Sequence, residues 1–417
     1  MLKKILTSSL WLLIGSSIGR LAIFITNIVA ARVLSQETFG QFMMIRSTIS
    51  MIEGIISGSL GSPMIKGVAE VAYSNKKKLS TVISSIFIVN ISMAIILIII
   101  LILLTPLLVE HFFINETKLI VGFYIGSILL LTTTLATMMQ NILTGFEEYK
   151  KLAYSGFISS LISLPIMLVL IYQFDFFGAL LGITIYFAID FLIKFIQFKK
   201  IYTNNLYTIP LQKIWEESKK ILIFSSPILG TVIINGFMFW YARIFIINES
   251  DNFSELALFD AAYQWQSIIM LITGSTTSVI LPMLTKSIIN TEEVKKIFYI
   301  NLVVNFLIAF SIAVIFIIFS KNIMLVYGES YSNGSEVLII LALNSIFFSL
   351  AAVYNRFFIA KSMPIVILIS VIFSSVAMEI SLYSDYFDGA KKLAISFLLF
   401  YLVNTLFFAT VKLYKKV

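Results

Sequence analysis

Residues 80–109 read STVISSIFIVNISMAIILIIILILLTPLLV, and this stretch contains no charged side chain. A helix needs about 20 predominantly apolar residues to cross the hydrocarbon core of a bilayer. Because that core holds no water, every backbone polar group must find a partner inside the protein, which excludes open strands. An unbroken apolar run of this length therefore predicts a transmembrane helix.

The whole chain has the composition of an integral membrane protein. Of its 417 residues, 59% are hydrophobic and 12% are charged, and a soluble domain of this length needs far more polar surface. The chain has no cysteine and one histidine, His111, so we expect neither a disulfide framework nor a metal centre or other cofactor. The lysines behind the net charge of +8 flank hydrophobic segments, which indicates control of membrane topology rather than binding to nucleic acid.

Twelve segments are long and apolar enough to be predicted spans, so the predicted fold class is an all-α integral membrane protein. Lysines such as Lys77, Lys150 and Lys199 lie in one alternating set of connections, and acids such as Asp175 and Asp388 lie in the other. Basic connections stay in the cytoplasm, so both termini are predicted to be cytoplasmic. The second and eighth spans carry the most polar side chains. The predicted spans run near 10–31, 42–62, 80–109, 119–143, 153–173, 176–198, 221–247, 258–283, 298–320, 335–360, 364–384 and 392–414.

A long polar connection, residues 199–220, follows the sixth span and predicts two halves of six helices each. Because six is an even number, both halves would enter the membrane from the same side, and any internal repeat would be parallel. The segment RVLSQETFGQF at 32–42, after the first span, weakly resembles DNFSELALFDAAY at 251–263, after the seventh. The predicted division is an N-terminal lobe at 1–204, a cytoplasmic linker at 205–220 and a C-terminal lobe at 221–417.

Four arginines lie inside the predicted spans: Arg20, Arg46, Arg243 and Arg356. A charge at the centre of a membrane helix costs about 3 kcal/mol on insertion scales, so such residues usually face a water-filled interior. A guanidinium group binds phosphate oxygens through a planar fork of N–H donors. The arginines are therefore candidate substrate-binding cations of a hydrated cavity.

The alternative is that these charges hold helices together as local ion pairs. Arg46 could pair with Glu53 and Arg243 with Asp260, and Arg356 could reach the nearby cytoplasmic interface. Asp190 and Lys194 are spaced as neighbours on one helical face. The carboxylates among these residues are also candidates for binding a coupling ion, H⁺ or Na⁺, which stays unassigned. The full set of possible coupling or ion-pair residues is Glu53, Asp190, Lys194 and Asp260, and the polar cavity residues are Asn27, Asn235 and Gln264.

The sequence contains no catalytic constellation, so we expect no enzyme and no catalytic residue. It has no paired-carboxylate motif, no glycine-rich phosphate loop before a lysine and no nucleophile elbow. A membrane-embedded glycan polymerase would normally carry a large external loop, and the predicted external connections are short. An ion-coupled exporter of small cations would need an acidic cavity, whereas the predicted cavity is rich in arginine. Both alternatives stay open at this point.

The chain resembles the Wzx-type polysaccharide flippases, which belong to the MOP (multidrug/oligosaccharidyl-lipid/polysaccharide) exporter superfamily together with the MATE transporters. The motifs follow the expected order over nearly the whole chain. They are SSIGRLAIFITNIVAARVL at 16–34 with FGQF at 39–42, QNILTGFEEYKKLA at 140–153, FSSPILGTVI at 224–233 and YGESYSNGSEVLIILAL at 327–343.

The resemblance implies two six-helix lobes around a central cavity that opens alternately to either side of the bacterial cytoplasmic membrane. It implies an undecaprenyl-diphosphate-linked oligosaccharide as substrate, moved to the outer leaflet for surface polysaccharide such as the O-antigen of lipopolysaccharide. By motif position, Arg20 and Arg243 would contact the diphosphate. The expected partners are membrane lipid, the lipid-linked glycan, and the polysaccharide polymerase with the chain-length machinery, and the expected state is a monomer. The first span departs from many drug exporters because its charged residue is Arg20 rather than an acid, which counts against drug export.

Overall fold

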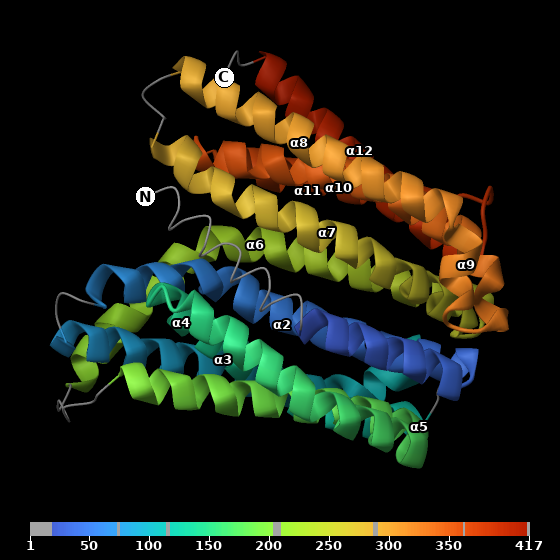
Figure 1. The fold of residues 1–417 in the computed structure, drawn as a ribbon, viewed down its shortest axis with the longest axis horizontal. Helices are drawn as coiled ribbons and strands as arrows, with labels where there is room; N and C mark the ends of the chain where they lie inside the picture. The colour runs from blue at the N-terminus through green and yellow to red at the C-terminus, as the bar shows by residue number, and fades with distance from the viewer. Residues whose placement is uncertain are drawn as a thin grey trace. The chain divides into compact units, whose positions relative to one another are not determined.

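The computed structural model describes residues 19–72, 76–113, 117–202, 210–286, 291–361 and 363–414, and these residues form helices and short connections (Figure 1). An unlabelled helix covers residues 19–33. The labelled helices are α2 (Gln36–Val71), α3 (Lys76–Phe112), α4 (Lys118–Gly145), α5 (Tyr149–Ile201), α6 (Leu211–Ser250), α7 (Ser254–Lys286), α8 (Thr291–Ile318), α9 (Ser320–Leu325), the 3₁₀ helix η1 (Glu329–Gly334), α10 (Ser335–Ala360), α11 (Pro364–Leu382) and α12 (Gly389–Tyr414).

Eight helices of the described part of the chain are long and apolar enough to cross a membrane, so the chain is a multi-pass integral membrane protein. One of them, α5, contains two of the predicted spans. They are separated at Asp175, where the backbone leaves the helical region with φ 45° and ψ −120°. Helices α2 and α7 cover the second and eighth predicted spans and are not among the eight, which were sought only in the described residues. The total of twelve spans therefore stays a prediction.

The chain divides into two compact units, and their limits differ from the predicted halves. The first unit contains residues 1–34 and 44–236, and the second contains 35–43 and 237–417. The predicted linker at 205–220 lies partly outside the described residues, and α6 already begins at Leu211. The boundaries between the two units fall within long helices, because the first turns of α2 and the last turns of α6 pack with the second unit.

In the first unit, α4 lies against α3 and α5 (Figure 1). Gly178, just after the break at Asp175, brings the second half of α5 onto the carbonyl oxygen of Leu170 in the first half. A Cβ atom there would overlap this backbone atom, so only glycine permits the close antiparallel contact. Gly182, one turn further, faces Met167 in the same way.

In the second unit, α10 contacts α7, α8 and α12, and α11 packs on α12 (Figure 1). The carboxylate of Glu37 accepts hydrogen bonds from the N–H of Phe253, at 2.8 Å, and the hydroxyl of Ser254, at 3.1 Å. These groups open α7, whose first N–H groups have no partner within the helix. Phe39 meets Tyr331 edge to face with ring centroids 6.1 Å apart, so the short segment 35–43 is anchored in this unit.

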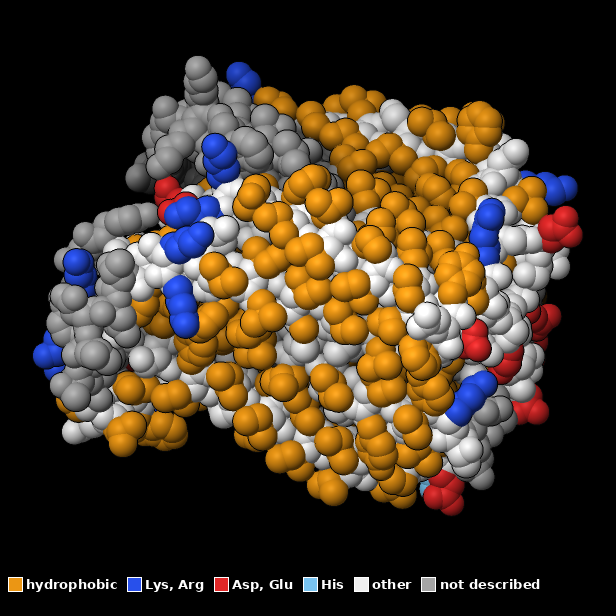
Figure 2. Space-filling model, turned by 60° about the horizontal axis from the view of Figure 1, so that its bottom comes forward, with side chains coloured by type: hydrophobic (Ala, Val, Ile, Leu, Met, Phe, Trp, Pro, Cys, Tyr) orange, Lys and Arg blue, Asp and Glu red, His pale blue; other side chains and the backbone are white. Residues whose placement is uncertain are grey.

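The surface is that of a protein embedded in lipid. Large apolar side chains are exposed along the helices, among them Leu103, Leu161 and Ile318. Figure 2 shows a broad hydrophobic zone on one face, with charged side chains at its margins. An apolar surface of this extent on a soluble monomer would be abnormal, whereas hydrocarbon requires it.

Candidate functional site

The first unit contains a cavity of about 200 Å³. Its wall comes from the helix at 19–33, from α4 and from both halves of α5, so the contact at Gly178 brings its components together. Two of its lining residues, Arg20 and Lys194, are basic, and one, Asp190, is acidic. The cavity is lined by Gly19, Arg20, Ile23, Gln140, Leu152, Ala153, Gly156, Tyr186, Phe187, Asp190 and Lys194.

Arg20 is exposed, and it forms no hydrogen bond or ion pair within the described residues. Its neighbour in the cavity is Tyr186, which is buried and hydrogen-bonded to Ser160. The hydroxyl of Tyr186 lies directly against Gly19, where a side chain would displace it. The guanidinium of Arg20 thus has its donors available for a ligand, beside a fixed phenol.

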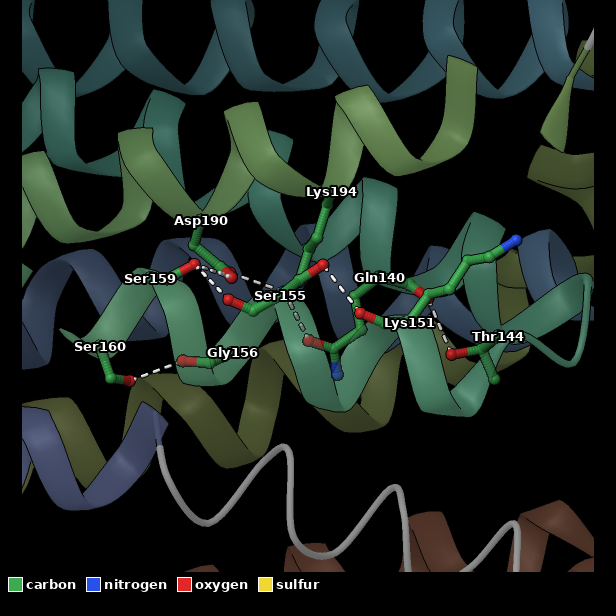
Figure 3. A network of polar contacts seen from close by, with 9 residues as sticks. All are labelled: Gln140, Thr144, Lys151, Ser155, Gly156, Ser159, Ser160, Asp190 and Lys194. Carbon is green, nitrogen blue, oxygen red and sulfur yellow. Dashed lines mark hydrogen bonds and ion pairs between the residues drawn. The ribbon is translucent and has the colours of Figure 1, made fainter. Parts of the chain in front are cut away.

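Lys194 is held in a buried polar network (Figure 3). Its Nζ lies 2.6 Å from Oδ2 of Asp190 and donates to Oε1 of Gln140 at 3.1 Å. The hydroxyl of Ser159 lies 3.1 Å from Oδ1 of Asp190 and 2.7 Å from the carbonyl oxygen of Ser155, so its one hydrogen is shared between these two acceptors. Asp190 and Lys194 form an ion pair in this structure. The charges of Arg20, Lys194 and Asp190 leave the cavity wall with one net positive charge.

A row of serines on α5 lets the helices approach closely around this network. Ser155, Ser159 and Ser160 donate to the carbonyl oxygens of the residues four positions earlier, at 2.7–2.9 Å. Such bonds satisfy a hydroxyl within its own helix and leave a small, flat helix surface. Figure 3 shows these serines on the helix that faces Asp190 and Lys194.

Arg46 and Glu53 have separate polar contacts in the first unit. Nη1 of Arg46 donates to Oδ1 of the buried Asn27 at 2.8 Å, which joins α2 to the helix at 19–33. Glu53 is hydrogen-bonded to Ser57 and Thr137. The predicted polar residue Asn27 is therefore a partner of a predicted cation. A coupling role for Glu53 remains a hypothesis.

In the second unit, Arg243 takes part in helix packing. Its Nη2 lies 3.2 Å from Oδ1 of Asp260, and its Nη1 donates to the carbonyl oxygen of Phe239 at 3.1 Å. Its guanidinium carbon lies 5.3 Å from the ring centroids of Phe259 and Tyr263 and 5.4 Å from that of Phe397. Arg243 is 7% exposed.

The expectation that Arg243 is a substrate-facing cation stays a prediction, and in this structure its charge is balanced by Asp260 and enclosed by aromatic rings. The alternative considered for it, an ion pair, is the arrangement observed. Arg356 is half-buried on α10, and among the described residues nothing hydrogen-bonds or ion-pairs with it. Gln264 is buried with both ends of its amide unbonded, and Oδ1 of Asn235 is likewise buried and unbonded.

Two polar side chains of the cavity wall, those of Gln140 and Tyr186, were not predicted. Tyr186, Asp190 and Lys194 follow one another at intervals of four residues, which places all three on one face of a helix. This spacing could have identified Tyr186. Gln140 comes from α4, and a lone glutamine in an apolar span gives no signal of which helix it faces.

One known protein family matches most of the chain. The family described as "Polysaccharide biosynthesis protein" matches residues 5–288. No curated protein sequence matches the chain.

The similar solved structures are transporters. One is the inward-facing conformation of a multidrug resistance MATE family transporter of the MOP superfamily, with TM-score 0.77, 13% identity and 97% of each chain covered. The outward-facing conformation of such a transporter gives TM-score 0.69 and 14% identity, over 99% of this chain and 95% of the other. A eukaryotic MATE transporter gives TM-score 0.75 and 12% identity with the same coverage. The chain has the MATE-like fold of MOP superfamily transporters, and it belongs to the polysaccharide biosynthesis protein family.

Proposed function

We propose that this protein is a flippase that moves undecaprenyl-diphosphate-linked oligosaccharide units from the inner to the outer leaflet of the bacterial cytoplasmic membrane. In this proposal, twelve spans form two six-helix lobes with both termini in the cytoplasm. The lobes open alternately to the two sides, and the solved relatives described as inward-facing and outward-facing motivate this cycle. The translocated units would then reach a polysaccharide polymerase and the chain-length machinery.

The physical task is to carry a diphosphate and several sugars across hydrocarbon while the lipid tail stays in the bilayer. A charge moved without partners would meet a barrier of many kcal/mol. A cation fixed in a hydrated cavity lowers that barrier, because the attraction between opposite charges is stronger there than in bulk water. The cavity of the first unit provides such a cation in a wall of net positive charge.

The observation that carries the proposal is the state of Arg20. It lines the cavity, it is exposed, and no carboxylate among the described residues neutralises it. By contrast, Arg243 and Lys194 each have an acidic partner. We therefore assign the first contact with the diphosphate to Arg20, and we expect its fork of donors to bind two phosphate oxygens.

The test replaces Arg20 in a strain whose surface polysaccharide depends on this protein. Arg20→Ala should abolish the surface polysaccharide and cause lipid-linked repeat units to accumulate on the inner leaflet, with normal protein level and insertion. Arg20→Lys should restore part of the activity, because a lysine keeps the charge and loses the fork. Arg32→Ala is the matched control, since Arg32 lies on the same helix and does not line the cavity.

Normal surface polysaccharide in the Arg20→Ala strain would refute the assignment. A deletion strain that exports dyes less well and still displays its polysaccharide would favour the alternative function, ion-coupled export of small molecules. In that case Glu53 would be the first carboxylate to test for the coupling ion.

A further inference from the structure

A second cavity, of about 590 Å³, lies in the second unit. It is built where three connections meet: the join of α6 and α7, the 3₁₀ helix η1 before α10, and the loop between α11 and α12. These connections belong to the set predicted to be external from the distribution of lysines. The volume is within the range of about 300–1,000 Å³ that is usual for pockets of small organic ligands. The cavity is lined by Glu249, Ser250, Glu255, Leu258, Asn333, Val337, Tyr386, Phe387, Asp388, Gly389, Ala390 and Lys391.

The wall of this outer pocket is held in place by two of its own carboxylates. Oε2 of Glu255 accepts the N–H of Ala390 at 2.8 Å and lies directly against Gly389. Gly389 has φ +53°, and a side chain there would overlap the carboxylate, so the loop can meet α7 this closely only at glycine. Glu249 forms an ion pair with the buried Lys392 of α12.

The lining side chains that remain available to a ligand are aromatic rings and hydrogen-bonding groups. Tyr386 is 88% exposed and Phe387 is also exposed. Asp388 and Asn333 are exposed, and neither side chain is bonded to any residue that the structure describes. The floor is apolar, since Leu258 and Val337 are buried.

This set of groups selects among ligand classes by charge. Glu249 is paired with Lys392, and the carboxylate of Glu255 is bonded to the N–H of Ala390. The lining cation Lys391 is paired with Glu336 of α10. Within the part of the chain that the structure describes, Asp388 therefore contributes the charge of the wall that has no partner. That charge repels an anionic ligand. Within the described residues, no group of three or more histidines, cysteines or acids could hold a metal ion. The ligand that fits is neutral, carries several hydroxyl groups and presents an apolar face.

A pyranose sugar has this combination of properties. The C–H groups that point to one side of its ring form an apolar face that packs on an aromatic ring, and its hydroxyls bond to carboxylate and amide groups. We propose that the outer pocket binds neutral sugar residues of an oligosaccharide, which pack on Tyr386 and donate to Asp388, with Asn333 as a second partner. The role of this site as a receiver of the glycan on the external side rests on the proposed function, whereas sugar binding itself does not.

The experiment measures the binding of free oligosaccharides to the full-length protein in lipid nanodiscs by saturation-transfer difference NMR. The probes are the methyl glycosides of glucose, galactose, N-acetylglucosamine and glucuronic acid, and the neutral oligosaccharide released from the strain's own surface polysaccharide. At least one neutral probe should bind, and glucuronic acid should bind more weakly than glucose. Tyr386→Ala should weaken binding about tenfold, because an aromatic anchor is lost.

Asp388→Asn should reduce the discrimination against glucuronic acid, because it removes the repelling charge and keeps a hydrogen-bonding group. Asp385→Asn is the matched control for this charge in the same loop, and Tyr172→Ala is the control for an exposed tyrosine. Neither control residue lines the pocket, so both variants should bind as the wild type does.

Absence of binding by every neutral probe would overturn the proposal, as would binding that Tyr386→Ala and Asp388→Asn leave unchanged. Tighter binding of glucuronic acid than of glucose by the wild type would also overturn it. Arg20→Ala serves as the reference for the proposed function, because it should bind the free sugars normally while losing translocation. A failure at the outer pocket and a failure of the flippase proposal therefore give different results.

Discussion

Removal of one partner of the Asp190–Lys194 ion pair should destabilise the first unit strongly. Both side chains are almost fully buried, at 6% and 7% exposure, and their charged atoms are 2.6 Å apart. Lys194→Met would leave Asp190 with the hydroxyl of Ser159 as its described partner, and Asp190→Leu would leave Lys194 with Gln140. Breaking a buried ion pair costs about 3–5 kcal/mol, because the remaining charge stays desolvated.

The double variant should recover most of this loss. With both charges gone, neither desolvation penalty remains, and apolar replacements of buried pairs are often neutral or stabilising. We expect Asp190→Leu/Lys194→Met to unfold within about 2 kcal/mol of the wild type, so the two single effects would be far from additive. Lys66→Met is the matched control, because Lys66 and Glu70 have the same spacing and are 63% and 58% exposed. It should change stability by less than about 0.5 kcal/mol.

The assay is equilibrium unfolding of the purified protein in mixed micelles by increasing amounts of SDS, followed by tryptophan fluorescence. All variants are compared at the same detergent composition, and the free energy of unfolding is extrapolated in the same way. If Lys194→Met costs less than about 1 kcal/mol, or if the single effects simply add, water reaches the pair. The network in Figure 3 would then contribute little to the stability of the unit.

Three further outcomes are expected. Arg243→Leu should destabilise the protein by about 3–5 kcal/mol in the same titration, and Arg243→Leu/Asp260→Leu should restore most of that loss, since Asp260 would otherwise stay charged and buried. Asp175→Gly should raise the free energy of unfolding by about 1 kcal/mol, because a residue with φ 45° is strained unless it is glycine; an unchanged value would mean that the surrounding contacts tolerate the side chain. Reporter fusions after Lys416 and near Lys213 should both give cytoplasmic signals, and an external signal at either would refute the predicted topology.

The membrane class and many of the helices could be predicted because they depend on local composition. The uncharged run at 80–109 lies within one helix, α3, and the runs at 153–173 and 176–198 lie within α5. Composition also singled out the second and eighth spans as the most polar. In the second span, the buried polar side chains Thr48 and Ser59 of α2 contribute to this polarity, since a helix that packs against protein can carry them.

The limits of the two units could not be predicted, because they depend on which neighbours a helix end meets. Nothing in the segment 35–43 indicates that Glu37 bonds to Phe253 or that Phe39 packs on Tyr331. These are contacts over more than two hundred positions of sequence. A polar connection such as 199–220 marks where the chain leaves the membrane, and it does not mark where one packed unit ends.

In the candidate site, contacts within one helix could be predicted and contacts between helices could not be settled. The spacing of Asp190 and Lys194 predicted their pairing, because residues four apart on a helix are neighbours. The pairing of Arg243 with Asp260 was one of two alternatives that the sequence left open, and the fold was needed to choose between them. Asn27 as the partner of Arg46, and Gln140 as a partner of Lys194, required the fold because they lie on other elements than these cations. A charge in an apolar span therefore predicted that the residue has a polar partner. It did not show whether that partner is a substrate or a side chain of another helix.

Three of the four membrane arginines, Arg20, Arg46 and Arg243, can be separated by the way in which their charge is stabilised. Arg243 has a carboxylate and three rings, and Arg46 has the amide of Asn27. A guanidinium whose charge is already neutralised must break its ion pair before it can bind phosphate, and that loss reduces its affinity for the ligand. Arg20 faces no such loss and lies in a cavity beside a second cation, Lys194. For this reason the effect of Arg20→Ala should be confined to translocation, whereas Arg243→Leu should reduce translocation only as far as it unfolds the protein.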